Sequence, residues 1–590
     1  MANITEKLKN ILNSIYGKDV RESIHDSIKA INEEVSANTD KQNWLEKKYD
    51  EQIKNIASSE PQNAEIVDAR WGFETLGSII KKKIYHFDNI KEMKNCLTLT
   101  TGDVVETLGY YSINDGGGAT YKIRNKVSED VEDNGSINFI GSNLVAELII
   151  ENDKVNVKQF GAKGNGETDD TDSIVNAINF ANNIYGNNDD IYYITDELTI
   201  NNKNLYNITI KIDPFEATIG NTYFKVFNCT GNNNFTNVKV NSYFAYDPSI
   251  DIYAGETEIN GIASNVEAFV ITAGLTNFYK CKTNGCWAFR ITDSGKVNIY
   301  DGDFKGCETS LFNSSNKEVK IYNSDFEINK QINSKYYHHI YAIQGSNTKF
   351  YNCNFTEVGE GSTGNHYHGY SPSFTSEMGV TGRLELNNCN LKTDAWCGQI
   401  NGVNLIVNGG NIECSLLLTD GTLVEKPLAY FKNVTITLNA NGDYNISYSQ
   451  IKMENCNVIV KGTGTKRISN QQFRIYDSIF KCENGGMSLD IATATSTNIF
   501  TKELIINNCN FACKIFSWCY PIYSTNFKYS NITITLSDEK TNSNPNNRGA
   551  IGYIYNCIFN NWALPIALAS NTDLKYKYIA NGVEKKNISA

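Results

Sequence analysis

The sequence predicts a mainly β chain whose central part is a parallel β-helix, a solenoid in which successive turns of chain stack on one another. Two observations carry this prediction. An eight-residue motif recurs from Val297 onwards, and several copies start 21 or 22 residues apart. The composition is rich in Tyr (34), Phe (27) and Gly (43) but poor in Pro (8). A fixed period of about this length is typical of repeat architectures, and aromatic residues favour strands.

Each copy of the motif reads apolar, any, apolar, any, Asn/Asp/Gly, small, any, apolar. Because side chains alternate between the two faces of a strand, positions one and three are expected to point inward. Positions six and eight then face inward on the next strand. The copies are VNIYDGDF (297–304), VKIYNSDF (319–326), TKFYNCNF (348–355), LELNNCNL (384–391), LIVNGGNI (405–412), IKMENCNV (451–458), FRIYDSIF (473–480), LIINNCNF (504–511) and GYIYNCIF (552–559).

The fifth position of the motif predicts a left-handed bend between two strands, because Asn, Asp and Gly tolerate that backbone conformation best. The expected bend residues are Asp301, Asn323, Asn352, Asn388, Gly409, Asn455, Asp477, Asn508 and Asn556.

The sixth position is a small residue and is cysteine in five copies, so we expect reduced, buried thiols rather than disulfides or zinc ligands. These residues are Cys353, Cys389, Cys456, Cys509 and Cys557.

The stretch VKQFGAKGNGETDDTDSIVNAINFA (157–181) predicts a glycine-rich reversal followed by a helix. Asp169, Asp170 and Thr171 offer acceptors to the free N–H groups of a first helical turn, so both aspartates are expected to cap it rather than to act in catalysis. This stretch resembles the opening of the pectate-lyase-like right-handed parallel β-helices that are frequent in phage tailspikes. The resemblance implies that the helix caps the N-terminal end of the solenoid.

Three earlier segments carry further resemblances. YGKDVRESIHDSIKAI (16–31) is an apolar-striped helix that resembles helical segments of tail and baseplate proteins in phages of Gram-positive hosts; an ordinary amphipathic helix is the alternative. DARWGFETLGSII (68–80) resembles a junction in phage baseplate and appendage proteins. The segment around Gly116–Gly118 lacks the Gly-Lys-Ser/Thr of a phosphate loop, predicts a tight hairpin, and resembles the particle-proximal β module of tailspikes.

We therefore expect five parts. They are a helical attachment and trimerisation stem (1–60), a linker or joint (61–85), a small β domain (86–150), the β-helix with its capping helix (151–565) and a C-terminal tail (566–590).

Charge and hydropathy limit the partners. Lys and Arg number 54 against 66 Asp and Glu, a net charge of −12 that disfavours nucleic-acid binding. No apolar run is long enough for membrane insertion, and the N-terminal segment lacks the apolar core of a secretion signal. We expect synthesis in a host cytoplasm and release by lysis.

Two spacings between motif copies are longer, 29 residues from Val319 to Thr348 and 36 from Thr348 to Leu384. A solenoid accommodates extra residues as lateral loops, which often form the binding surface. Aromatic and polar side chains there suit a sugar. The predicted glycan-binding residues are Tyr337, His338, His339, Tyr341, His366, Tyr367, His368, Tyr370 and, one coil on, Trp396.

Glycan cleavage requires two carboxylates, about 5–5.5 Å apart in retaining enzymes. Equivalent residues on adjacent coils lie at about one strand spacing. The candidates are Asp303, Asp325, Glu327, Glu357 and Asp394. The alternative for Asp303 and Asp325 is a hydrogen-bonded surface ladder, since the same position is Asn in most later copies.

His366 and His368 with His338 or His339 form a pattern that also fits a transition metal. Polar contacts within an aromatic-rich loop are the favoured alternative, and we expect no metal and no cofactor.

Together the resemblances imply a tail spike or appendage protein of a phage virion, a homotrimer attached through residues 1–80 to other tail or baseplate proteins. Its shaft is expected to bind a host cell-wall glycan, either teichoic acid or capsule, during adsorption. Two hypotheses stay open. One is a depolymerase, glycoside-hydrolase-like rather than a lyase, and the other is a non-catalytic receptor-binding or structural spike.

Overall fold

The computed structural model of the chain has two compact units, 1–85 and 86–590. The described residues are 18–57, 85–212, 224–242, 266–305, 309–315, 317–329, 338–342, 347–358, 382–392, 403–414, 428–439, 444–463, 465–490, 502–518, 525–540, 551–562 and 573–587. The predicted joint at 68–80 lies outside these residues.

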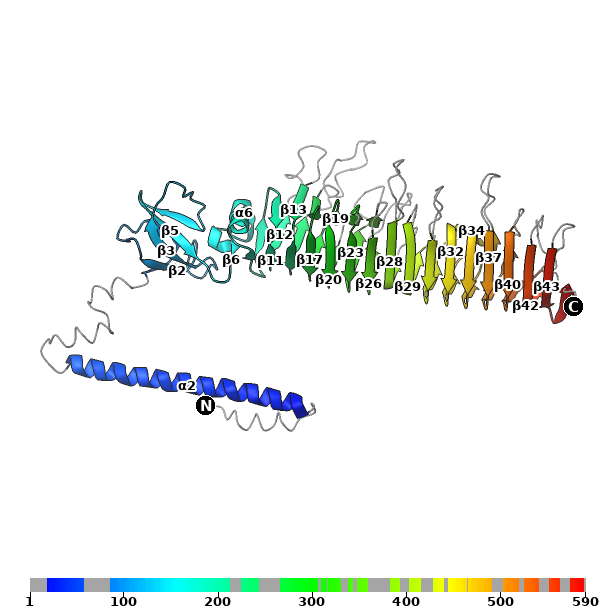
Figure 1. Cartoon of the computed structure of the whole chain (residues 1–590), viewed down its shortest axis with the longest axis horizontal. Coiled ribbons are helices and arrows are strands. Elements are labelled where there is room, and N and C mark those ends of the chain that lie inside the picture. The colour runs from blue at the N-terminus through cyan, green and yellow to red at the C-terminus, as the bar shows by residue number, and fades with distance from the viewer. Residues whose placement is uncertain are drawn as a thin grey trace. The chain divides into compact units, whose positions relative to one another are not determined.

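The predicted fold class is confirmed: the chain is mainly β, with long parallel sheets that form a right-handed β-helix, preceded by a helix and a small β domain (Figure 1).

In the N-terminal unit the structure describes α2 (Lys18–Ala57), a continuous helix. Apolar side chains of its sequence stripe are exposed, with Ile24 at 39 %, Ile31 at 60 % and Val35 at 55 %. Leu45 and Tyr49 further along are exposed as well. A single helix with an exposed apolar stripe requires a partner surface to bury it.

A five-stranded sheet begins the second unit, in the order β1 (Tyr85–Phe87), β2 (Val104–Thr107), β3 (Ala119–Asn125), β5 (Leu144–Ile149) and β4 (Ile137–Ile140), with α5 (Ile90–Lys94) beside it. The connection from β2 to β3 carries the triple glycine. Its preceding Asp115 accepts backbone N–H groups from Tyr110, Tyr111, Ser112 and Gly117. Burial acts to raise the pKa of Asp115, but the four hydrogen bonds have the larger effect. The net result is a pKa below the usual value for an aspartate. β2 and β3 pair antiparallel, so the predicted hairpin is present, but the connection runs from 108 to 118, so the prediction of a tight hairpin is wrong.

The cap of the solenoid comprises η1 (Val157–Phe160), β7 (Asn165–Asp169) and α6 (Thr171–Phe180). Asp169 accepts hydrogen bonds from the N–H and hydroxyl of Thr171, so its predicted capping role is confirmed. The prediction for Asp170 is wrong, because its carboxylate makes no cap bond to the helix. It accepts instead the N–H groups of Lys163 (2.7 Å) and Gly164 (3.0 Å) and holds the glycine-rich reversal.

Beyond the cap, each coil contributes two strands separated by the bend, and corresponding strands of successive coils pair in parallel. β6 (Lys154–Asn156) and β7 begin the two series. The first series is β8 (Asn183–Tyr185), β11 (Asn204–Tyr206), β14 (Asn233–Thr236), β17 (Leu275–Tyr279), β20 (Lys296–Tyr300), β23 (Glu318–Tyr322), β26 (Asn347–Tyr351), β28 (Gly382–Lys392), β29 (Val403–Cys414), β30 (Leu428–Lys432), β32 (Tyr444–Glu454), β34 (Thr465–Tyr476), β37 (Lys502–Asn507), β40 (Thr525–Ser530), β42 (Ile551–Trp562) and β43 (Asp573–Ala580).

The second series follows the bend; β28, β29 and β42 run through it and belong to both series. Its separate strands are β9 (Ile191–Tyr193), β12 (Thr209–Ile212), β15 (Lys239–Ser242), β18 (Lys282–Asn284), β21 (Asp303–Lys305), β24 (Asp325–Asn329), β27 (Asn354–Val358), β31 (Thr435–Leu438), β33 (Asn457–Val460), β35 (Ile479–Cys482), β38 (Asn510–Cys513) and β41 (Thr533–Lys540).

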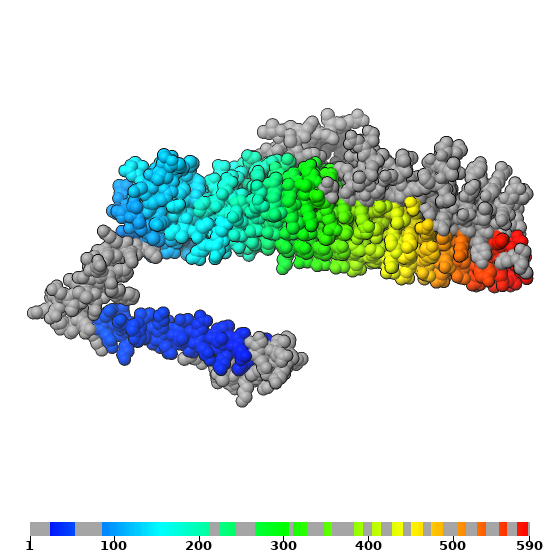
Figure 2. Space-filling model, viewed as in Figure 1, coloured from blue at the N-terminus to red at the C-terminus, as the bar shows by residue number. Residues whose placement is uncertain are grey.

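A third face is a separate parallel sheet, which we call the six-stranded sheet. Further on, one more strand pairs with the start of β34, and a second pairs with that strand. β44 (Val583–Asn587) folds back antiparallel on β43. The colours in Figure 2 follow the coils of this unit in chain order. The six strands are β10 (Leu198–Asn201), β13 (Phe224–Thr230), β16 (Val266–Ile271), β19 (Trp287–Ile291), β22 (Thr309–Asn313) and β25 (His338–Ala342), and the two later ones are β36 (Gly486–Asp490) and β39 (Ile515–Trp518).

The predicted left-handed bends are confirmed at all nine positions. Their side chains also pair from coil to coil, as when Asn352 donates to Asn323 (3.2 Å) and Asn388 donates to Asn352 (2.9 Å). The φ angles are Asp301 55°, Asn323 49°, Asn352 54°, Asn388 53°, Gly409 71°, Asn455 52°, Asp477 49°, Asn508 55° and Asn556 53°.

The interior is lined by stacked rings and small residues. Phe227, Phe269 and Phe289 stack at 5.4 Å between centroids of successive rings. The five predicted cysteines are free thiols, each at most 3 % exposed, as expected. Burial raises the pKa of Cys509 to about 12 and that of Cys557 to about 11, so both stay protonated and unreactive at neutral pH.

The bend predicts a difference between two variants of one residue. Asn352→Ala keeps a Cβ at positive φ but loses the side-chain amide that lets Asn tolerate this conformation, at a cost of roughly 1–2 kcal/mol, whereas Asn352→Gly has no Cβ to strain. Both variants remove the same amide bonds, so each serves as the control for the other. Hydrogen exchange of the amides in β26 and β27 should be about ten-fold faster in the Ala variant than in the Gly variant. Equal exchange in the two would show that φ at this position is not the constraint.

Candidate functional site

The outward side of the first strand series carries a ladder of amides. Each Asn donates its side-chain N–H to the side-chain oxygen of the equivalent Asn one coil earlier, at 2.7 to 2.9 Å. An amide used in this way keeps a second N–H and acceptor capacity for a ligand. The members are Asn183, Asn204, Asn234, Asn277 and Asn298.

A column of tyrosines, each the last residue of its strand before the bend, lies beside the last two amides and continues onto the next two strands. Tyr279, Tyr300, Tyr322 and Tyr351 are stacked, with ring centroids 5.1, 5.1 and 4.8 Å apart and interplanar angles of 4 to 9°. Because each inner ring covers the faces of its neighbours, solvent meets chiefly ring edges. We name the amide ladder and this column together the ladder face.

The ladder face becomes charged on the next two coils. Glu318 forms ion pairs with Lys320 (2.6 Å) and Lys349 (2.7 Å). Hydrogen bonds from these two lysines, that of Lys320 first, lower the pKa of Glu318 to about 2. The carboxylate of this group is already held by two ammonium groups, so we assign it no acid–base role.

Two of the predicted catalytic residues, Asp303 and Asp325, are direct neighbours in register on β21 and β24. Asp303 pairs with Lys282 at 3.3 Å and with Lys305 at 3.6 Å. Asp325 accepts a hydrogen bond from Asn354 (2.7 Å). The row continues as Asn390 donates to Asn354 (2.9 Å) and Asn411 donates to Asn390 (2.8 Å). These contacts are those of the surface ladder, the alternative that the sequence left open.

The other predicted residues are placed only in part. Glu327 lies in β24 between Lys305 and Thr356 of the neighbouring strands. Glu357 lies in β27 opposite Ile328, and the structure describes its backbone alone. On β25, His338 is opposite Thr309 and Tyr341 is opposite Phe312, with His339 between them. The remaining candidates lie outside the described residues: Tyr337, His366, Tyr367, His368, Tyr370, Asp394 and Trp396.

A cluster that sequence reasoning missed lies on the six-stranded sheet. Glu267 of β16 is 1 % exposed and forms an ion pair with the Nε of Arg290 on β19. The guanidinium carbon of Arg290 lies 4.8 Å from the Phe312 ring centroid and 5.6 Å from that of Trp287. The second carboxylate oxygen of Glu267 accepts no hydrogen bond within the described structure. A glutamate inside the apolar run VEAFVI was the sequence signal.

Burial raises the pKa of Glu267, and this effect outweighs the opposing charges of Arg290 and Lys225. The carboxylate of Glu197 adds to the rise. Glu197 itself accepts the backbone N–H of Lys225 (3.1 Å), and Lys225 is the register neighbour of Glu267. Glu197, which directly precedes β10, and Glu267 of β16 thus lie on either side of β13.

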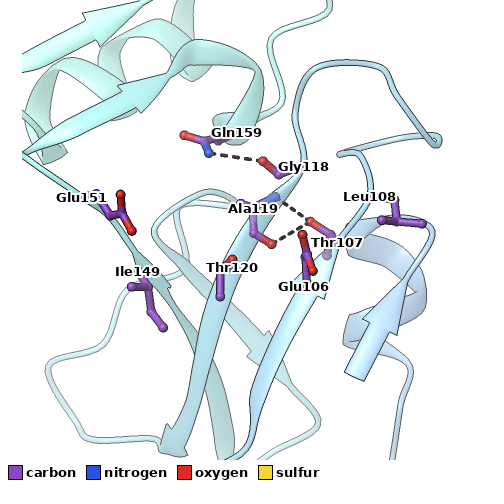
Figure 3. A pocket seen from close by; sticks show the side chains of 9 residues that line it. All are labelled: Glu106, Thr107, Leu108, Gly118, Ala119, Thr120, Ile149, Glu151 and Gln159. Carbon is purple, nitrogen blue, oxygen red and sulfur yellow. Dashed lines mark hydrogen bonds between the residues drawn. The ribbon is translucent and has the colours of Figure 1, made fainter. Parts of the chain in front are cut away.

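A cleft of about 490 Å³ lies where the small β domain meets η1 (Figure 3). Its polar groups are partly occupied, because Gln159 donates to the Gly118 carbonyl (3.3 Å) and Thr107 bonds both to the N–H and to the carbonyl of Ala119. Glu106 and Glu151 add acidic charge on its rim, and Glu106 contacts His86 at 3.2 Å. We assign no ligand to this cleft.

Within the part of the chain that the structure describes, no three His, Cys, Asp or Glu side chains are grouped so that they could hold a metal ion. None of the described helices is both long and apolar enough to cross a membrane.

No family model and no curated protein matches this sequence. Among solved structures, the chain is similar to the tailspike protein gp49 of Acinetobacter baumannii bacteriophage Fri1, a capsular polysaccharide depolymerase, with 10 % identity, 84 % of this chain and 74 % of that chain covered, and a TM-score of 0.32. It is also similar to PfbA, a surface adhesin of Streptococcus pneumoniae, with 13 % identity, 74 % of this chain and 94 % of that chain covered, and a TM-score of 0.32.

A third similar structure is the enzymatically active domain of tailspike protein 4 of bacteriophage CBA120, with 13 % identity, 83 % of this chain and 55 % of that chain covered, and a TM-score of 0.27. Because all three TM-scores are below 0.5, we argue the function from the residues of this chain.

The raised pKa of Glu267 predicts how stability depends on pH. The folded protein holds this proton more tightly than the unfolded chain, so the stabilisation is complete below the unfolded pKa and is lost as pH rises through the folded pKa. Glu267→Gln, which remains neutral, should flatten the fall in melting temperature over this range. The exposed Glu151→Gln is the matched control, and a flattening of the same size in both would contradict the assignment.

Proposed function

We propose that the chain is a phage tail spike or appendage whose β-helical shaft binds a linear glycan of the host surface, teichoic acid or capsule. The observation that carries this proposal is the ladder face. It presents amides and phenol edges at a repeat of one strand spacing, about 4.8 Å, along many coils. A regular row of hydrogen-bonding groups beside aromatic edges suits a polymer of repeating hydroxylated units.

The predicted loop residues extend this proposal to the neighbouring coils. Tyr337, His338, His339 and Tyr341 belong to the connection into β25 and to that strand, and His366, Tyr367, His368, Tyr370 and Trp396 to later connections. All nine remain proposed glycan-binding residues.

The α2 helix supports the proposed homotrimer. Its apolar residues Ile24, Ile28, Ile31 and Val35 follow one another at steps of four, three and four, the spacing of a coiled-coil seam, and Leu45 and Tyr49 continue the same register. β-Branched residues at both core positions favour three or more strands over two. In this proposal residues 1–80 also attach the spike to tail or baseplate proteins of the virion, and the chain is made in the host cytoplasm and released by lysis.

A second candidate function is depolymerisation, and the Glu267 cluster favours it. A buried carboxylic acid with a raised pKa is the kind of group that protonates a leaving glycosidic oxygen, and Glu197 is a second carboxylate nearby. The sequence candidates Asp303, Asp325, Glu327, Glu357 and Asp394 remain proposals for the same chemistry. Among these, Asp303 and Asp325 already have ladder partners.

One experiment with purified host wall polymer distinguishes binding of the polymer from its cleavage. Tyr300→Ala with Tyr322→Ala removes the middle of the ladder face and should weaken binding by about ten-fold or more, as expected if each lost contact is worth about 1 kcal/mol. The measurement is a binding isotherm on immobilised polymer. Tyr430→Ala with Tyr476→Ala, two tyrosines in the first strand series of later coils, is the control.

Polymer chain length is followed in the same samples by gel electrophoresis and mass spectrometry. Shortening that disappears in Glu267→Gln with binding retained would establish the depolymerase. Binding without shortening leaves a receptor-binding spike. Unchanged binding in the Tyr300/Tyr322 variant refutes the ladder face as the binding surface.

The seam in α2 predicts the assembly state. Ile31→Glu with Val35→Glu places charges at its centre and should convert a trimer into monomers, measured on the full chain by light scattering coupled to size exclusion. The matched control is Glu33→Gln with Glu34→Gln, which lies between the seam positions. A wild-type monomer, or a variant that remains trimeric, would contradict the assignment of α2 as the trimerisation helix.

A further inference from the structure

The hairpin of β43 and β44 contains an unfavourable pair of charges. Lys577 and Lys586 lie directly opposite each other across the antiparallel ladder, so their side chains project on the same side. Like charges in this position destabilise a sheet. One acidic contact partly offsets them, since Lys577 lies 3.3 Å from the carboxylate of Glu584. The folded chain therefore concentrates positive charge here at a cost in stability.

Two more lysines lie near this pair, one on β43 itself and one on β40. Along β43, Lys575 and Lys577 are two residues apart, and both are exposed. Their register partners on β42 are Tyr553 and Tyr555, and Lys528 of β40 is the next neighbour of Tyr553. We name Lys528, Lys575, Lys577, Lys586 and the 39 % exposed Tyr555 the basic patch.

The spacing of the basic patch suits a polymer better than a small anion. Residues two apart on a strand are about 6.5 Å apart, and neighbouring strands are about 4.8 Å apart. The four ammonium groups therefore form a shallow lattice rather than a converging pocket. A flexible chain with one negative charge per repeat can meet several of them in succession, and the exposed part of Tyr555 adds an apolar contact for a sugar ring.

We propose that the basic patch is a second binding surface, specific for a polyanionic surface glycopolymer that carries a phosphodiester or carboxylate in each repeat. This inference rests on the proposed glycan-binding function and adds the chemical class of the polymer. The ladder face supplies hydrogen bonds to hydroxyl groups, and the basic patch supplies the charge selectivity. A duplex nucleic acid is disfavoured by the net charge of −12, which repels a dense polyanion at long range.

The test compares the affinity of the full-length protein for defined probes. These are poly(glycerol phosphate), polygalacturonate, neutral dextran and duplex DNA, each at 50 and 300 mM NaCl. The variant is Lys577→Gln with Lys586→Gln, and the matched control is Lys432→Gln with Lys461→Gln, two exposed lysines elsewhere on the shaft.

We expect the wild type to bind one or both anionic polymers at least ten-fold more tightly than dextran, with the advantage reduced at the higher salt concentration. The phosphate and carboxylate arms identify which anion is preferred. The Lys577/Lys586 variant should lose this advantage while the control keeps it. Its melting temperature should stay equal or rise, because the unfavourable pair is gone; a purely structural role for these lysines predicts a fall.

Three outcomes overturn the inference: equal affinity of variant and control, equal wild-type affinity for anionic and neutral polymers, or binding to DNA alone. Failure of the proposed function is distinguishable, because it concerns the Tyr300/Tyr322 variant and host wall polymer. If that variant keeps its binding while the Lys577/Lys586 variant loses it, the basic patch stands and the ladder face does not.

Discussion

The left-handed bend between the two strands of each coil is the constraint on which the rest of the shaft depends. A residue at φ near +50° turns the chain without breaking either strand, so every coil presents its next strand at the same angle. Asparagine tolerates this conformation and also carries an amide that bonds to the coil below. Asparagine therefore meets two requirements at once: it adopts the left-handed conformation of the bend, and its amide hydrogen bond holds neighbouring coils in register. Where Gly409 occupies the position the bend remains, although the side-chain ladder is interrupted there.

Parallel stacking then makes the surface repetitive. Because equivalent residues of adjacent coils lie in register, any outward position becomes a row, and a row of unpaired like charges would be unfavourable. The chain fills such rows with amides, with stacked tyrosines, or with lysines that share a nearby glutamate, as Lys320 and Lys349 share Glu318. The same rows that satisfy this requirement form a regular array, so in the proposed function stability and recognition share one set of side chains.

The repeat could be predicted from the sequence because it depends on the conformation and burial of residues within one eight-residue motif. The bend at Asn352 and the buried thiol of Cys389 follow from position in an eight-residue motif, and both were predicted. The role of Asp170 was not, since its partners Lys163 and Gly164 are set by the path of a loop. The Glu267–Arg290 pair joins residues on different coils, and no periodicity indicates which outward residues of the third sheet face each other. Among the predicted catalytic residues, Asp303 and Asp325 were placed on adjacent coils because they belong to the motif.

At some positions that depart from the repeat, the side chains lower the stability of the protein although the fold does not require them. A buried carboxylate with one oxygen that accepts no hydrogen bond from the described residues, as at Glu267, and two lysines opposed across a hairpin, as at Lys577 and Lys586, both reduce the stability of that part of the chain. An amide ladder could occupy either position without that cost, as it does on many coils. A ligand that donates a hydrogen bond to Glu267, or that carries negative charge to the lysines, would remove the penalty on binding. The two irregular sites therefore have different chemistry from the ladder face: one is acidic and buried, and the other is basic and exposed. A single polymer with hydroxyl groups and a repeated anion would satisfy all three.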